Sequence, residues 1–217
     1  MNKLFVFILI SLFAATSLAQ SVQDQTRETA FKLTQQHQYL EAAEAFGKLV
    51  SADPENASLH LQLAAYHLRA KDMDRYLADV ERAVNLKPDD ESIVMGAVRT
   101  LQGQGKPDLC SRALKMVDTY LEAHKESHLG YHYRFFIHQC LGDRVTAYKD
   151  ISIAIELAPN IALYQSNRAN LVSLMGDSAF AIKTLQELIG TIELRLADAP
   201  QDPNAVAEIK RELSMTH

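Results

Sequence analysis

Four histidines are grouped in the second half of the chain, at His124, His128, His132 and His138. The first three follow one another at intervals of four residues, which would place them on one face of a continuous helix, where imidazoles can bind a divalent metal. A zinc site needs three or four protein ligands. The His124–His138 region therefore raises the hypothesis of a metal-binding or small catalytic protein, and the choice depends on where the helices begin.

Cys110 and Cys140 are the two cysteines of the chain. Two thiols can form a disulfide in an oxidising compartment, or they can remain reduced and pack as small hydrophobic side chains. The sequence must therefore indicate a compartment before the cysteines can be interpreted.

The N-terminus has the features of a secretory signal peptide. Lys3 precedes an apolar run from Leu4 to Phe13, and Ser17-Leu18-Ala19 provides the small residues of a cleavage site. The run has about half of the roughly 20 apolar residues that a membrane-spanning helix needs. We expect cleavage after Ala19, no stable membrane anchor afterwards, and an exported protein. The expected location is the bacterial periplasm, with secretion as the alternative.

Other kinds of chemistry find no support in the sequence. Gly103-Gln104-Gly105-Lys106 lacks the spacing of a phosphate-binding loop, and no strand precedes it. There is no G-x-S-x-G motif. The formal net charge is -5, without a run rich in Lys or Arg, so the concentrated cations of a nucleic-acid-binding surface are missing. We expect neither an enzyme, nor a cofactor, nor nucleic acid as a partner.

The elements that position these residues are helices arranged in a repeat. The segment from Ala57 to Asp90 contains two helical patterns, 58–70 and 73–86, separated by a short polar break. Pro54 precedes the segment, Pro88 lies near its end, and the two prolines are 34 residues apart. A period of about 34 residues, made of two helices and a turn, is typical of an array of helical hairpins.

At these positions the chain resembles the tetratricopeptide repeat (TPR) family, whose pattern has small residues where the two helices of a hairpin cross and a proline near the end of the unit. The matching residues include Ala30, Ala42 and Pro54; Ala64, Ala83 and Pro88; Gly142, Ala147, Ala154 and Pro159; and Ala169 and Gly176. The first helix is expected to bury Ala30, Phe31 and Leu33. The third unit lacks its closing proline, and its second helix is expected to be about one turn longer than the pattern.

The resemblance implies an all-α fold, a tetratricopeptide-type helical-hairpin solenoid of about five repeats with a C-terminal capping helix. Residues 20–198 would form the array, with repeats at about 23–56, 57–90, 91–127, 128–161 and 162–195, and residues 199–217 would form the cap. A helix boundary would fall near Ser127. Only His128 and His132 would then share a helix, which favours hydrogen-bonded or solvated histidines over a metal site.

The first helix of each hairpin lines the concave face of such an array. The residues that the resemblance assigns to a partner-binding groove there are Met95, Arg99, Leu129, His132, Tyr133, Phe136, Gln139, Asn167 and Asn170, with Ser166 beside them. Such side chains suit an extended peptide or a partner helix, although Tyr133 and Phe136 suit packing between hairpins equally well.

What the resemblance implies for function is a non-enzymatic protein- or peptide-binding scaffold or adaptor acting outside the cytoplasm. Self-association as a homo-oligomer is a further alternative. The same alignment puts Cys110 in the first turn of one helix and Cys140 in the last turn of an antiparallel neighbour. A Cys110–Cys140 disulfide and a pair of buried free thiols both stay open at this point.

Overall fold

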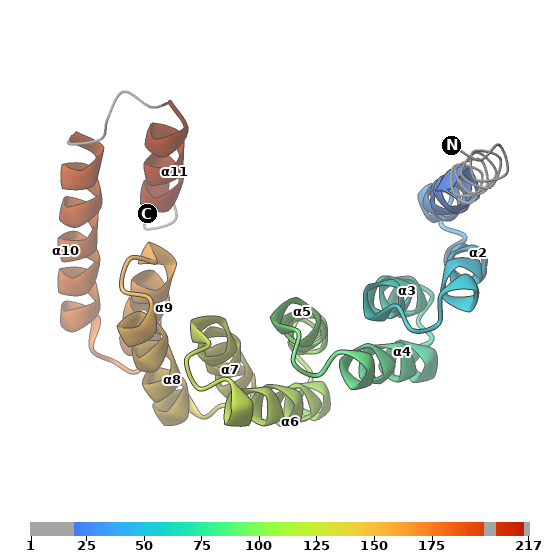
Figure 1. Ribbon diagram of the computed structural model, residues 1–217. Coiled ribbons are helices and arrows are strands. Elements are labelled where there is room, and N and C mark those ends of the chain that lie inside the picture. The colour runs from blue at the N-terminus through green and yellow to red at the C-terminus, as the bar shows by residue number, and fades with distance from the viewer. Residues whose placement is uncertain (1–19, 198–202, 215–217) are drawn as a thin grey trace, which may run out of the picture. The chain divides into compact units, whose positions relative to one another are not determined.

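The structure is a computed structural model that describes residues 20–197 and 203–214 (Figure 1). Every regular element in these two ranges is a helix, and none of them is long and apolar enough to cross a membrane. The predicted signal peptide, residues 1–19, lies outside the described residues, as do residues 198–202 and 215–217 of the chain's C-terminal part.

The helices follow one another as hairpins. The first covers residues 20–35. It is followed by α2 (Tyr39–Ala52), α3 (Ala57–Arg69), α4 (Met73–Leu86), α5 (Glu91–Gln102), α6 (Pro107–Ala123), α7 (His128–Cys140), α8 (Arg144–Leu157), α9 (Ala162–Leu174), α10 (Ser178–Ala197) and α11 (Pro203–Ser214). The most extensive packing joins α3 to α4, α7 to α8 and α9 to α10. The predicted all-α fold of consecutive helical hairpins is confirmed.

Each hairpin turns at a residue with a left-handed backbone. The φ angles are 61° at His37, 60° at Lys71, 64° at Gly105, 80° at Gly142 and 101° at Gly176. A left-handed residue just past a helix lets the following N–H groups bond to the last carbonyls of that helix. These five residues follow one another at intervals of 34, 34, 37 and 34. The same turn is therefore repeated in register through the chain.

The interval of 37 residues has its origin in α6. This helix has 17 residues, whereas α2, α4 and α8 each have 14. Pro107 occupies its first turn, where a missing N–H costs nothing. The longer second helix expected for the third unit is thus present. The next helix, α7, begins at His128. Its N-cap is Ser127, whose side chain accepts a hydrogen bond from the Gly130 N–H.

The chain divides into two compact units, Met1–Ala97 and Val98–His217. In the first unit, Phe46, Leu49 and Leu63 form the core together with Ala30 and Ala43. Phe31 is 59% exposed, which corrects the expectation that it points inward. Neighbouring residues on a helix are about 100° apart, so burying the Ala30 side directs Phe31 outward.

In the second unit, buried side chains join α7 to α11 in two successive clusters, and further buried side chains lie in α5 and α6. One joins α7, α8 and α9 through Phe135, Ile151, Tyr164 and Leu171, with alanines at the helix crossings. The other joins α9, α10 and α11, and consists of Ala162, Leu188, Ile192 and Ile209. Ile209 is the residue of α11 in this cluster. The last helix therefore covers apolar side chains of the α9–α10 hairpin.

Candidate functional site

Two first helices of consecutive hairpins, α7 and α9, are joined side by side through polar contacts. His128 Nδ1 lies 2.7 Å from the Tyr164 hydroxyl oxygen, near the beginning of both helices. One turn further along, Asn167 Nδ2 lies 2.9 Å from His132 Nε2. Because the two contacts occur in the same order along both helices, α7 and α9 run parallel.

Beside these contacts each helix carries a row of apolar, aromatic and amide side chains. We call these two rows the amide–aromatic face. Helical spacing aligns Leu129, Tyr133, Phe136 and Cys140 on α7 and Leu163, Asn167, Asn170 and Leu174 on α9. Leu174 is 61% exposed and Asn170 is also exposed. Exposed apolar side chains next to hydrogen-bonding amides are typical of surfaces that bind another protein chain.

His132 lies beneath this face rather than on it. Its ring is buried, with ring centroids 4.5 Å from Tyr164 and 5.0 Å from Phe136. Burial, with a smaller contribution from nearby His128, lowers the pKa of His132 to about 4. The imidazole is therefore neutral at pH 7, and Nε2 can accept the hydrogen bond that Asn167 donates. His132 orients Asn167 at the surface.

The other residues assigned to the groove differ in their accessibility. Leu129, Tyr133, Phe136, Gln139 and Asn167 are half-buried, while Arg99 and Asn170 are exposed. Met95 is only 4% exposed and Ser166 is buried as well, so neither offers side-chain surface to a partner. In α5 the residues from Ile93 to Val98 are nearly all buried, so hydrophobic periodicity could not identify an outer side there.

The four clustered histidines have separate neighbours. His124 stacks on Tyr120 with ring centroids 4.3 Å apart, and His138 Nε2 lies 3.7 Å from Asp150 Oδ2. His128 and His132 face α9. Within residues 20–197 and 203–214, no three His, Cys, Asp or Glu side chains are grouped so that they could hold a metal ion. The geometry gives the metal hypothesis no support.

An ion network centred on the half-buried Arg134 of α7 joins three helices, and sequence patterns did not reveal it. Arg134 Nη2 and Nε donate to the two carboxylate oxygens of Asp150 at 2.7 and 3.0 Å, and its Nη1 donates to Asp118 at 2.9 Å. Burial opposes the guanidinium charge, but the hydrogen bonds to Asp150 and Asp118 outweigh it and raise the pKa of Arg134. The network links α6, α7 and α8 through charges that all have partners.

The first unit contains a comparable cluster around Asp79 of α4. His67 Nδ1 lies 2.7 Å from one Asp79 carboxylate oxygen, and His60 Nδ1 lies 3.3 Å from the other. His60 Nε2 also donates to the Pro54 carbonyl oxygen at 2.9 Å. Both histidines are buried, so a single carboxylate joins the two imidazoles of α3 to the second helix of its hairpin.

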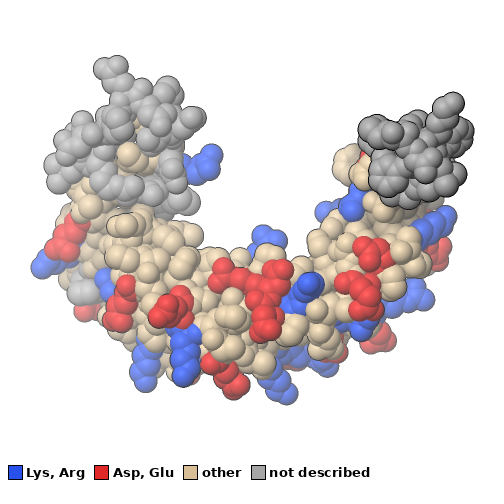
Figure 2. Space-filling view, viewed as in Figure 1, with Lys and Arg blue, Asp and Glu red and all other residues tan. Residues whose placement is uncertain are grey.

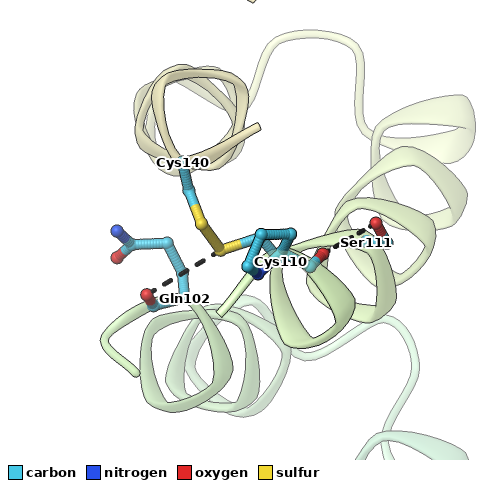
Figure 3. Close-up of a disulfide and its surroundings, with 5 residues drawn as sticks. Gln102, Cys110, Ser111 and Cys140 are labelled. Carbon is cyan, nitrogen blue, oxygen red and sulfur yellow. Dashed lines mark hydrogen bonds between the residues drawn. A yellow bond between two sulfur atoms is a disulfide. The ribbon is translucent and has the colours of Figure 1, made fainter. Parts of the chain in front are cut away.

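Cys110 and Cys140 form a disulfide (Figure 3). Their Cα atoms are 6.4 Å apart, within the range that a disulfide spans. The bond joins the first turn of α6 to the last residue of α7. The choice that the sequence left open is thus decided in favour of the disulfide, and the two cysteines are not free thiols.

Figure 2 shows how the charged side chains are distributed on one side of the protein. On the side shown in Figure 2, Lys and Arg are interspersed with Asp and Glu and do not form a continuous basic area. Binding to a polyanion depends on concentrated positive charge. The Lys and Arg side chains visible on this side are not concentrated in that way.

The repeated turn, the hairpin packing and the small residues at the helix crossings define the tetratricopeptide-type helical-hairpin fold. Solved structures with a similar fold include MamA from Desulfovibrio magneticus, at 12% identity and a TM-score of 0.57, covering 82% of this chain and 98% of that one. A thermophilic TPR protein from Thermus thermophilus has 18% identity and a TM-score of 0.51, covering 88% and 99%.

A TPR protein from Parabacteroides merdae is also similar, with 14% identity and a TM-score of 0.57 over 89% of this chain and 84% of that one. No protein-family model and no curated protein matches the sequence. At such identities the structural similarity shows the fold, and function has to be argued from the site.

Proposed function

We propose that the protein is a non-enzymatic scaffold or adaptor that binds a partner protein through the amide–aromatic face of α7 and α9. The observation that carries this proposal is the pair of rows of exposed and half-buried side chains, in which Asn167 and Asn170 accompany the apolar residues and Gln139 follows Phe136 on α7. The similarity to the solved TPR proteins from Thermus thermophilus and Parabacteroides merdae supports a repeat fold of the kind that presents such surfaces.

The partner element that fits this face best is an extended peptide segment. The carboxamides of Asn167, Asn170 and Gln139 can each donate and accept hydrogen bonds. An extended segment offers backbone N–H and C=O groups to them, whereas a partner helix has used those groups internally. Side chains of the segment would pack against Tyr133 and Phe136, as aromatic anchors commonly do in interfaces.

We place this activity outside the cytoplasm. The apolar leader with its small-residue cleavage site supports export, and a disulfide between Cys110 and Cys140 is stable in an oxidising compartment. The intact mass of protein purified from its native host tests this part. A mass lacking residues 1–19 is expected, and a mass that retains them would contradict export by cleavage.

The binding site is tested by affinity capture from a native envelope fraction, followed by titration of the captured partner with purified variants. Tyr133→Ala and Phe136→Ala should weaken binding at least tenfold, because losing an interface anchor commonly costs ~2 kcal/mol or more. Val145→Ala is the matched control, since Val145 is exposed on α8, the second helix of the hairpin. Equal affinities for all three variants would place the binding surface elsewhere.

Self-association is distinguished from partner binding by light scattering on the purified protein. A monomer at concentrations well above that used for capture agrees with a separate partner. An oligomer that dissociates on Tyr133→Ala would instead make a second copy of this chain the occupant of the face.

A further inference from the structure

The two sulfur atoms of the disulfide lie in different surroundings. Cys110 is completely buried, and the backbone oxygen of Gln102 lies 4.0 Å from its Sγ (Figure 3). Cys140 is half-buried and is the last residue of α7. Thiol–disulfide exchange requires the attacking thiolate to reach the sulfur that it attacks. Of the two cysteines, Cys140 is the more accessible to such an approach.

Cys140 belongs to the amide–aromatic face because of its position on α7. It follows Phe136 by one turn, in the row of side chains on α7 that forms part of the amide–aromatic face. A thiol that approaches this row meets Cys140 at its end. Cys110, by contrast, lies in the first turn of α6, where the helix dipole favours the negative charge of a departing thiolate.

We propose that Cys140 is a thiol-exchange site, at which an external thiol forms a reversible mixed disulfide. The thiol loses its proton, and its sulfur bonds to Cys140 Sγ. The bond between Cys140 and Cys110 breaks, its electron pair goes to Cys110 Sγ, and that thiolate takes up a proton from solvent. The protein disulfide is the oxidant, so no further reactant is needed. The inference does not depend on the proposed partner.

Cys110 then becomes the group that reverses the reaction. It remains in the first turn of α6, next to the end of α7, and can attack Cys140 Sγ in the mixed disulfide to expel the thiol. The adduct should therefore be short-lived in the wild-type protein and long-lived once Cys110 is replaced.

The test compares two matched variants, Cys110→Ala and Cys140→Ala, each with one free thiol. Both are incubated with oxidised glutathione under native conditions, and adduct formation is followed by intact mass. We expect Cys140 in the first variant to react at least 100-fold faster than Cys110 in the second. In a denaturant the two rates should become similar, because burial no longer protects Cys110. Comparable rates in the folded proteins would overturn the proposal.

A second measurement avoids variants whose folding is altered. The wild-type protein is exposed to reduced glutathione, quenched with acid, and digested so that the modified cysteine is identified by peptide mass. Glutathione on Cys140 is expected. Glutathione on Cys110 in equal or greater yield, or the absence of any adduct on Cys140, would overturn the proposal even if the variants failed to fold.

Discussion

His67 and Asp79 are joined across the α3–α4 hairpin by a contact of 2.7 Å between Nδ1 and Oδ2, and they are 12 residues apart in the chain. His138 and Asp150 have the same separation across the α7–α8 hairpin, with 3.7 Å between Nε2 and Oδ2. The second partner differs, being a histidine at Asp79 and Arg134 at Asp150. Two hairpins thus share one carboxylate position, half-buried at Asp79 and buried at Asp150, and the two carboxylates have different basic partners.

This difference predicts unequal effects of removing the carboxylate. Asp150→Ala leaves Arg134 half-buried and still charged, because a guanidinium does not lose its proton in proteins. Asp79→Ala leaves two histidines, which can be neutral. We expect Asp150→Ala to lower the free energy of unfolding by about 3 to 5 kcal/mol and Asp79→Ala by about 1 to 3 kcal/mol. Urea unfolding of both variants measures the difference.

If Asp150→Ala and Asp79→Ala lower the free energy of unfolding equally, Asp118 alone is sufficient to stabilise the charged Arg134 side chain. Asp118→Ala is the control for this outcome. Its carboxylate is more exposed than that of Asp150, so its removal should have the smaller effect.

The buried His132 predicts a stability that falls in acid. The folded protein holds the pKa of His132 at about 4, below its ordinary value of 6.5, so the unfolded chain takes up a proton first as the pH falls. The contribution of His132 is therefore complete above about pH 6.5 and is lost as the pH falls towards 4. The loss is on the order of 3 kcal/mol, since each pKa unit corresponds to about 1.4 kcal/mol.

His132→Phe keeps a ring at this position and removes the titration. The free energy of unfolding of this variant should change less between pH 7 and pH 4.5 than that of the wild type. The other titrating groups are common to both proteins, and among them His128 interacts with His132. Identical pH dependence in the two proteins would show that His132 does not resist protonation in the folded state.

Two helical glycines predict opposite responses to the same substitution. At Gly130 an added Cβ would lie 2.7 Å from Leu121 Cδ2 and 3.2 Å from its Cγ, whereas at Gly47 it would meet nothing within 4 Å. Gly47→Ala should raise stability by about 0.5 to 1 kcal/mol through helix propensity. Gly130→Ala should lower it by about 1 kcal/mol or more, because the buried Leu121 must move. Thermal unfolding distinguishes the signs, and a stabilising Gly130→Ala would contradict close packing of α6 on α7.

The disulfide predicts a stability that depends on reduction. Its two cysteines are separated by 30 residues, and closing a loop of this size restricts the unfolded chain by about 3 to 4 kcal/mol. The melting temperature of the wild-type protein should therefore fall in a strong reductant. The double variant Cys110→Ala, Cys140→Ala should melt at the lower temperature with or without reductant. A melting temperature insensitive to reductant in the wild type would show that the bond adds little.

The helical hairpins could be predicted because their signals are local. The prolines after α2, α4 and α8 and the alanines at the helix crossings recur with the repeat and need no knowledge of distant contacts. The proximity of Cys110 and Cys140 also followed from the order of antiparallel helices. These features depend on one repeat unit and its immediate neighbour.

The ion clusters around Asp79 and Asp150 depend on more than periodicity. Nothing in the composition of α8 shows that Asp150 is buried, since a carboxylate is more often exposed. A signal was nevertheless present, because His67 and Asp79 recur at the same repeat positions as His138 and Asp150. The burial of Met95 could not be predicted, because α5 is apolar on several sides and its sequence does not identify an outer one.

In a hairpin array each unit contacts mainly its neighbours, so separate parts of the chain can open independently. The bond between Cys110 and Cys140 connects α6 of one hairpin to α7 of the next. While it is closed, no fluctuation can part these two helices at that junction. Backbone amides of α6 and α7 should then exchange their hydrogens through a single shared opening, and the array should open first at junctions without a covalent link.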